Sequence, residues 1–263
     1  MLEPLIAYCG PAPTPSEIGW RWNLDPVLLA LLAGAAYCVV RFGGQRPYDR
    51  QLGLSAIGLM VVVFVSPLCA LSSALFSARV LHHVLLIAAV APLLAMAFPL
   101  LIRPGRRPVT ALAVIHAVIL WLWHIPGVYA WGLETVSAYW LMQLSLLISA
   151  WALWSAIFAA MPNRRSDAGT GAGTGAGTGA ELGGALIALV GTIAQMGMLG
   201  AVIVFAPEPL YAVHFFSTVS WGLSPLADQQ LAGLLMWVPA ALPYVVAGLW
   251  MLWSALDTGE TSP

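Results

Sequence analysis

Residues 80–101 read VLHHVLLIAAVAPLLAMAFPLL, an apolar run that contains no Asp, Glu, Lys or Arg. About 20 such residues form a helix long enough to cross the hydrocarbon core of a membrane. Six further apolar runs lie at residues 26–40, 52–71, 109–125, 136–161, 183–206 and 231–256. The sequence therefore predicts an all-α, polytopic membrane bundle with about seven transmembrane helices over residues 26–256.

The composition of the chain agrees with this prediction. Of its 263 residues, 60% are hydrophobic and 8% are charged, whereas a soluble domain usually carries about 25% charged residues. The 12 Trp residues gather near the ends of the runs, where indole rings sit at the level of the lipid headgroups. The sequence contains no basic nucleic-acid-binding patch, phosphate-binding loop or nucleophile elbow. We therefore expect neither nucleic-acid binding nor an enzyme.

The orientation of the bundle follows from its Arg residues, because the chain contains no Lys. Eight of the ten basic residues follow the first, third and fifth runs, and only Arg21 and Arg79 lie on the opposite side. Basic residues are enriched in cytoplasmic loops. This pattern places the N-terminus outside and the C-terminus in the cytoplasm of a bacterial plasma (inner) membrane. Residues 1–25 then form an extracytoplasmic tail, and residues 257–263 form a cytoplasmic one.

Two other sequence features bear on the organisation of the chain. A Gly-Thr-Gly-Ala repeat over 169–180 predicts a flexible linker, at 166–181, in the cytoplasmic loop between the fifth and sixth spans. Of the three Cys residues, Cys38 lies near the inner end of the first span, away from Cys9 and Cys69. The sequence allows an outer disulfide between Cys9 and Cys69, but their spacing shows no pairing pattern, and we expect free thiols.

All the His residues of this chain lie toward its predicted outer side, and they are His82, His83, His116, His124 and His214. His83 is about one turn into the third span and His124 ends the fourth, whereas His116 lies roughly 12 Å deeper along the same helix. Asp228 opens the seventh span from the outer side. Ionisable groups inside a membrane are costly and usually face the bundle interior. We therefore predict that His83, His124 and Asp228 face one shared cavity.

The chemistry of these side chains suits copper, because imidazoles bind copper and thioethers favour Cu(I). Met142 and Met236 lie toward the outer side, and Met196 and Met198 lie deeper. The candidate metal ligands are His83, His124, His82, His116, Asp228 and Met236. Each has a structural alternative, because a Met in a membrane helix usually packs against its neighbours. A His at a helix end, likewise, often makes interfacial hydrogen bonds.

Four segments of the chain resemble the CtaG family of membrane-embedded cytochrome c oxidase assembly factors. They are SPLCALSSALFSARVLHHVLLIAAVAPLL at 66–94, LWLWHIPGVYAWGLE at 120–134, FAPEPLY at 205–211 and GLSPLADQQLAGLLMWVP at 222–239. The segments cover the second to seventh spans in the same order as in the family. The resemblance implies a seven-span fold and a role in oxidase assembly that is linked to copper insertion.

The resemblance also implies particular histidines, and this chain departs from some of them. The family pattern has a His-x-x-x-His pair at the start of the third span and a His followed by Glu-His in the fifth. Those positions correspond here to Arg79 and His83, and then to Tyr139, Met142 and Gln143. The His of the fourth span and the Asp-Gln-Gln segment of the seventh carry over as His124 and residues 228–230.

These observations favour an assembly factor that loads copper into a haem–copper oxidase from the extracytoplasmic side. His83 and His124, together with His82 and a Met, would hold copper loosely and pass it on by ligand exchange. Its partners would be oxidase subunits and copper donors in the membrane or periplasm. Asp228 would orient a histidine or fix a local charge, and Arg79 would repel a cation unless an acid such as Asp228 pairs with it. Two alternatives remain: a metal-free membrane scaffold or accessory subunit of the oxidase, and a b-type haem protein that uses His83 and His124 as axial ligands.

Overall fold

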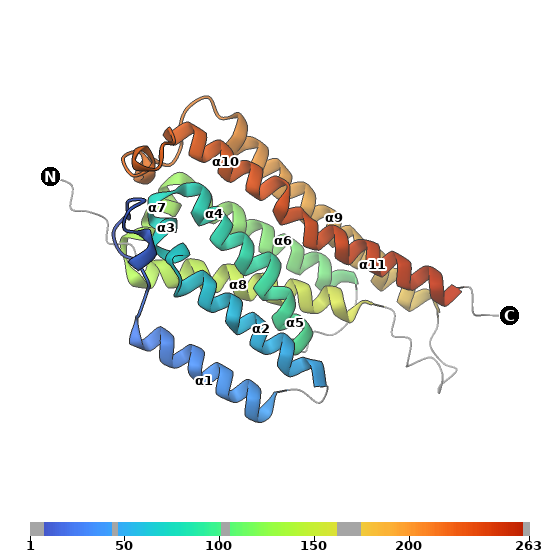
Figure 1. Ribbon diagram of the computed structural model, residues 1–263. Coiled ribbons are helices and arrows are strands. Elements are labelled where there is room, and N and C mark those ends of the chain that lie inside the picture. Colours follow the sequence, from blue (N-terminus) through green and yellow to red (C-terminus); the bar gives the residue numbers. More distant parts are fainter. Residues whose placement is uncertain (1–7, 44–46, 101–105, 162–174, 260–263) are drawn as a thin grey trace.

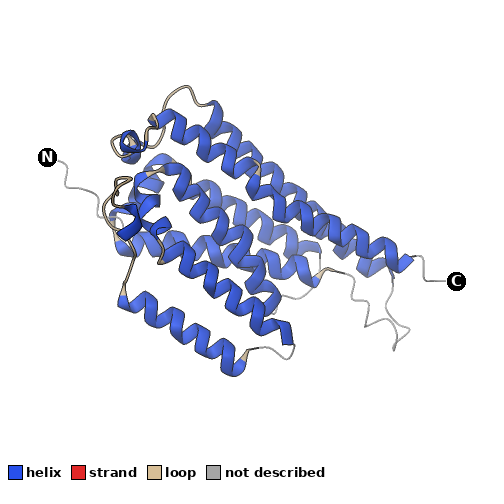
Figure 2. Ribbon diagram, in the orientation of Figure 1, coloured by secondary structure: helices blue, strands red, loops and turns tan. Residues whose placement is uncertain are grey.

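The computed structural model describes residues 8–43, 47–100, 106–161 and 175–259. Helices joined by short loops make up these ranges, and no strand occurs in them (Figure 2). The predicted all-α fold class is therefore confirmed for the described part of the chain.

The main helices are α1 (Pro26–Phe42), α2 (Pro47–Phe64), α3 (Pro67–Ala74), α4 (Phe76–Leu85), α5 (Ala91–Ala97), α6 (Arg106–Trp123), α7 (Pro126–Glu134), α8 (Val136–Ala159), α9 (Gly175–Phe205), α10 (Pro225–Trp237) and α11 (Leu242–Gly259). Shorter turns are η1 (Ile18–Trp20), η2 (Leu86–Val90), η3 (Ala212–His214), η4 (Thr218–Trp221) and η5 (Pro239–Ala241).

Four helical stretches of the described chain are long and apolar enough to cross a membrane: Phe76–Ala97, Val136–Ala159, Gly179–Phe205 and Pro225–Leu256. Two bent pairs add one span each if each pair crosses as a unit: α2–α3, bent by 45°, and α6–α7, bent by 78°. Four to six candidate spans indicate a multi-pass membrane protein. The remaining predicted span is α1, which is apolar but has only 17 residues. The count of seven therefore stays a prediction.

Three helices begin with the same local signal, a polar cap followed by Pro. The side chains of Asp25, Ser66 and Ser224 accept hydrogen bonds from backbone N–H groups in the first turns of α1, α3 and α10. The Pro that follows each cap has no N–H group to leave unsatisfied. The cap at Ser66 explains why the apolar run at 52–71 forms two helices with a bend between them.

The stretch from α4 to α5 contains a π-helical turn at Leu86–Val90. Pro92 interrupts the backbone hydrogen bonding of this stretch. It has no N–H group to donate to the carbonyl of Ile87, five residues earlier. The indole Nε1 of Trp154 in α8 donates a hydrogen bond to that carbonyl over 3.0 Å. A side chain of α8 thus satisfies the backbone group that Pro92 leaves open.

Figure 1 shows α1 beside α2 at one edge of the molecule and α9, α10 and α11 at the opposite edge. The described N-terminal segment, α3, α7 and the loop between α9 and α10 gather at one end of the bundle (Figure 1). The other end holds the last turns of α5 and α11 (Figure 1). We call the first of these the outer end, following the orientation predicted from the Arg residues.

Residues 8–25, which were predicted to form a tail, pack over the outer end. The backbone N–H group of Asn23 donates to the carbonyl of Val65 over 2.9 Å. A disulfide joins Cys9 to Cys69, whose Cα atoms are 5.2 Å apart. The expectation of free thiols at these two positions is therefore wrong. The pairing arises because the N-terminal segment packs on α3. The spacing of the cysteines along the sequence does not predict that contact.

The predicted linker is partly helical. α9 begins at Gly175, inside the 166–181 segment, whereas residues 162–174 lie outside the described part of the chain. Extending an existing helix requires no new nucleus. A Gly- and Ala-rich stretch can therefore join the long apolar helix that follows it.

α9 and α10 approach each other at two glycines. A Cβ atom added to Gly233 would lie 2.7 Å from the carbonyl oxygen of Gly200 and 2.5 Å from Cγ2 of Val204. Small residues permit this close backbone packing between membrane helices. The contact fixes α10, and it thereby sets the position of Asp228 at the start of that helix.

Replacement of Gly233 by Ala should force α9 and α10 apart and destabilise the folded protein by about 1–3 kcal/mol, as overpacking commonly does. Thermal unfolding of the purified protein in detergent would measure the change. The control is Gly191→Ala in α9, where an added Cβ meets nothing within 4 Å. That variant should be as stable as the parent or slightly more so. Equal unfolding midpoints for the two variants would contradict the proposed close packing.

The orientation of the bundle can be tested by cysteine labelling of intact cells. In a Cys38→Ser background, Ala172→Cys and Ala176→Cys should resist a membrane-impermeant maleimide, because the predicted topology places them in the cytoplasm. Phe216→Cys should react, because Phe216 is 94% exposed in the outer loop before α10. Labelling of position 172 or 176 from outside would overturn the orientation.

Candidate functional site

The carboxylate of Asp228 joins α10 to the start of α4. Its Oδ2 accepts a hydrogen bond from the backbone N–H of Phe76 over 2.6 Å, and its Oδ1 accepts one from the backbone N–H of Ser77 over 3.2 Å. The hydroxyl of Ser77 donates a third bond to Oδ1. Leu75, at the N-cap position of α4, has no side-chain oxygen to do this. Asp228, which is 1% exposed, therefore caps α4 from 151 residues away in the sequence.

The next residue, Gln229, joins α10 to the end of α9. Its amide Nε2 donates to the carbonyl of Ile203 over 3.1 Å, in the last turn of α9. Its Oε1 accepts from the backbone N–H of Leu210 over 2.6 Å. The amide thus satisfies a free carbonyl at a helix C-terminus and holds the following loop. The Asp-Gln pair is a structural joint between three segments of the outer end.

One face of α4 carries Arg79, His82 and His83, at the i, i+3 and i+4 positions that bring side chains together on a helix. Arg79 and His82 are fully buried, and His83 is 6% exposed. The two imidazole rings meet edge to face, with centroids 5.7 Å apart. α4 therefore presents one permanent cation and two imidazoles to the interior of the bundle.

His83 and His124 differ in the partners of their ring nitrogens. His83 Nε2 lies 3.2 Å from the amide Nε2 of Gln143 in α8, so this ring nitrogen accepts a bond when the amide donates. His124 Nδ1 lies 2.7 Å from the carbonyl oxygen of Leu120. That bond places the proton on Nδ1 and leaves the Nε2 lone pair of His124 free for a ligand. The two histidines lie close enough to interact electrostatically.

His214, in η3, lies in the same region. Its Nε2 is 2.7 Å from the hydroxyl of Tyr129 in α7. Burial, together with the nearby charge of Arg79, lowers the pKa of His214 to about 3. The ring is therefore neutral at physiological pH, and its Nε2 can accept the hydroxyl proton of Tyr129 in a hydrogen bond.

We call His82, His83, His124 and His214 the histidine group. Two predicted ligands lie apart from it. His116 contacts Ser149 of α8, with its Nδ1 2.9 Å from the hydroxyl oxygen, and it lies about two turns along α6 from His124. Met236 is 3% exposed in the apolar core, about two turns along α10 from Asp228. Both side chains therefore have the structural role that was the alternative to metal binding: Met236 packs in the core, and His116 makes one hydrogen bond.

The role predicted for Asp228 needs correction. It was expected to orient a histidine or to fix a local charge such as that of Arg79, but its hydrogen bonds go to the first turn of α4. No ion pair joins Asp228 to Arg79, and none of the guanidinium nitrogens of Arg79 has a hydrogen-bond partner. Asp228 contacts residues about two turns, or roughly 10 Å, before His83 along α4. The carboxylate bonds to α4 because the free N–H groups of a buried helix N-terminus need hydrogen-bond acceptors.

The described residues contain no cluster of three or more His, Cys, Asp or Glu side chains suited to a metal ion. His83 and His124 lie within electrostatic reach of each other, and His82 adds a third imidazole beside His83. Sequence reasoning missed Tyr129 and Tyr211, which contact His214 and the backbone of His124. The only sequence signal for them was their place in the two family-like segments at 120–134 and 205–211.

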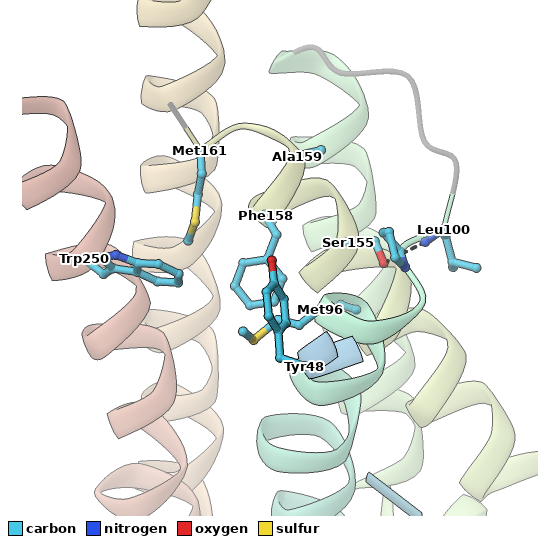
Figure 3. A pocket seen from close by; sticks show the side chains of 10 residues that line it. Tyr48, Met96, Leu100, Ser155, Phe158, Ala159, Met161 and Trp250 are labelled. Atoms are coloured by element: carbon cyan, nitrogen blue, oxygen red, sulfur yellow. Dashed lines mark hydrogen bonds between the residues drawn. The ribbon is translucent and has the colours of Figure 1, made fainter. Parts of the chain in front are cut away.

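A cavity of about 440 Å³ lies at the opposite end of the bundle, between α5, α8 and α11. Figure 3 shows Met96, Met161, Phe158 and Trp250 around it. Ser155 of α8 contributes a hydroxyl group to the lining of the cavity. This hydroxyl already accepts a hydrogen bond from the backbone N–H of Leu100 over 3.2 Å (Figure 3). The cavity is therefore mainly apolar, and it is separate from the histidine group at the outer end.

Replacement of Asp228 by Asn should leave at least one N–H group of α4 without an acceptor, because an amide offers only one oxygen. Losing a buried charged hydrogen bond should destabilise the protein by about 1.5–3 kcal/mol. The unfolding midpoint in detergent would measure this loss. The matched control is Glu208→Gln, which removes a carboxylate charge from an exposed residue of the outer loop. If both variants unfold at the parent midpoint, Asp228 is not a structural cap.

Comparison with known proteins identifies the family of the chain. A search of curated proteins and a search of solved structures gave no match. The model of the cytochrome c oxidase caa3 assembly factor family, Caa3_CtaG, matches residues 35–258. The match begins within α1, ends within α11 and includes every residue of the histidine group. It confirms the resemblance seen in the sequence, and the chain belongs to the cytochrome c oxidase caa3 assembly factor family.

Proposed function

We propose that this protein acts in the bacterial plasma membrane as an assembly factor that delivers copper to a haem–copper oxidase. Membership of the family supports the role in oxidase assembly, and the apolar helices support a place in the membrane. The Arg distribution supports an outer end that faces the extracytoplasmic side. The protein would work by binding and release, with no catalysed reaction, and its partners would be oxidase subunits and copper donors.

The observation that carries the copper proposal is the state of His124. Its Nδ1 is held by the carbonyl of Leu120, an arrangement that orients an imidazole and leaves Nε2 ready for a metal. His83 supplies a second imidazole once Gln143 releases its Nε2, and His82 lies beside it. Two imidazoles suit a loosely held cargo of Cu(I), which can leave by ligand exchange to a partner.

Arg79 opposes this cargo, because a fixed positive charge near His82 and His83 repels a metal cation. Cu(I) is repelled less than Cu²⁺ because it carries one charge. Asp228, His116 and Met236 have no part in the proposed ligand set, since each already has another role or place in the fold. The proposal therefore rests on His83 and His124, with His82 as a third nitrogen ligand.

The buried Arg79 favours a second candidate function, a scaffold that binds oxidase subunits and carries no metal. A permanent cation in place of a family histidine, and the engagement of His83 by Gln143, both weaken a metal site. In this reading the histidines serve the packing of the outer end, as His116 does deeper in the bundle.

Single substitutions of the histidines would separate these two functions. Under copper limitation, His124→Ala and His83→Ala should lower active copper-containing oxidase, while the amount of this protein in the membrane stays near that of the parent. Loss of even an outer partner of a metal ligand usually costs roughly 10-fold or more in affinity, so we expect at least that loss in copper retained by the purified protein. Oxidase activity, membrane abundance and bound copper would be measured together.

The matched control is His116→Ala, which removes another fully buried histidine from the same helix system. It should retain copper and oxidase activity, although loss of its hydrogen bond could cost about 1–3 kcal/mol of stability. Parental oxidase activity in both His124→Ala and His83→Ala would reject copper delivery and favour the scaffold. An equal loss of abundance in all three variants would show that the histidines act only in folding.

A further inference from the structure

Arg79 is a buried cation without a hydrogen-bond partner. Its side chain is 0% exposed, and none of its nitrogens, Nε, Nη1 and Nη2, makes a hydrogen bond. It lies in the first turn of α4, inside the Phe76–Ala97 span. An Arg side chain cannot lose its proton in a protein. The charge therefore persists at this position whatever surrounds it.

Two tyrosines lie beside the guanidinium without neutralising it. The Cζ atom of Arg79 is 5.4 Å from the centre of the Tyr139 ring, which gives a cation–π contact. The hydroxyls of Tyr129 and Tyr139 are also near, although neither reaches hydrogen-bond geometry with the guanidinium. A neutral hydroxyl can donate to a bound anion, but it cannot balance a positive charge.

Asp228, the acid named above as a partner for Arg79, already has other hydrogen-bond partners. Its oxygens accept three hydrogen bonds from Phe76 and Ser77, and it makes no ion pair with Arg79 within the described residues. Its charge offsets the partial positive charge that the N-terminus of α4 carries. Arg79 is left without an acidic side chain in direct contact.

Other unpartnered polar atoms gather around the same cation. His82 is fully buried, and neither of its ring nitrogens makes a hydrogen bond, although the carbonyl of Val63 is near. The Nδ1 of His214 is also buried and unpartnered, although the carbonyls of Ser73 and Ala74 are near. His82 and His214 both lie within electrostatic reach of Arg79. Native proteins leave few such groups open, so their concentration in one region indicates a bound species.

The free-energy cost of burying an unpaired charge indicates which kind of ligand would bind there. A buried and unpaired ion costs several kcal/mol, and a charge inside a membrane is costly as well. Water would satisfy the open N–H groups but would leave the charge unbalanced. An anion would do both, because it accepts hydrogen bonds from the guanidinium and cancels its charge.

We propose that Arg79 is the centre of a binding site for one small monovalent anion of the size of chloride. The guanidinium N–H groups would donate to it, assisted by the hydroxyl of Tyr129 or Tyr139 and by an N–H group of His82. A single negative charge matches the single uncompensated positive charge. A small ion suits a site among packed helices better than a divalent oxyanion, which would also leave an excess of negative charge.

The anion would change the electrostatics of the neighbouring imidazoles. With its charge balanced, Arg79 would no longer repel a cation held by His82 and His83. The site itself does not require copper, so its existence can be tested on the purified protein without a metal or an oxidase.

The test is thermal unfolding of the full chain in detergent at constant ionic strength, with chloride replacing gluconate. The parent midpoint should rise in a saturable way, by roughly 3–6 °C when chloride is tenfold above its dissociation constant. Arg79→Gln should abolish this dependence. The control Arg21→Gln, which removes a partly exposed cation from the same end of the molecule, should keep it. Equilibrium dialysis with radiolabelled chloride should find one ion per parent chain and none per Arg79→Gln chain.

A second measurement keeps the proposal testable if Arg79→Gln fails to fold. Crystals of the parent protein grown in bromide should show an anomalous scattering peak beside the guanidinium of Arg79. A parent midpoint that does not depend on chloride, an unchanged chloride shift in Arg79→Gln, or the lack of a bromide peak at Arg79 would each overturn the proposal. A shift produced by formate or acetate and not by chloride would show that the site takes a carboxylate, and it would overturn the assignment to a chloride-sized ion.

Discussion

The hydrogen bonds of Asp228 to the first turn of α4 are the interaction on which the outer end depends. α4 starts inside the bundle after Leu75, which cannot cap it, and the free N–H groups of a buried helix start must find acceptors. Asp228 supplies them from α10, while Gln229 holds the end of α9 and the loop after it. The close contact at Gly233 sets where α10 lies. The imidazoles of α4 have their positions because these joints place α4.

Committing the carboxylate to a helix end has a chemical consequence. Arg79 then lies among His82, His83, Tyr129 and Tyr139 with no acid of its own. The outer end therefore combines a cation with neutral rings, and one imidazole, His124, has a free nitrogen. Any ligand bound at this site lies near the positive charge of Arg79. The balance of that charge decides whether a metal cation or an anion is favoured there.

Much of the fold could be predicted from the sequence, because apolar runs of about 20 residues report membrane helices directly. The runs at 136–161 and 183–206 correspond to α8 and α9, and four segments of the sequence identified the family that the family model confirms. Bends were harder, since they depend on local Pro and cap residues such as Ser66. The Cys9–Cys69 disulfide was mispredicted, because it records the packing of the N-terminal segment on α3.

The sequence by itself determined the membrane class, the family and the gathering of histidines toward one end, since these follow from composition, run length and order along the chain. Only the tertiary structure decided which polar groups meet. Asp228 was expected to orient a histidine or to fix a local charge, yet the carboxylate bonds to α4, and the guanidinium of Arg79 lies beside tyrosine. Hydrogen-bond partners far apart in the chain depend on how the helices rotate and approach one another. Periodicity and spacing do not encode those angles, so the chemistry of the site appeared only when the helices were placed together.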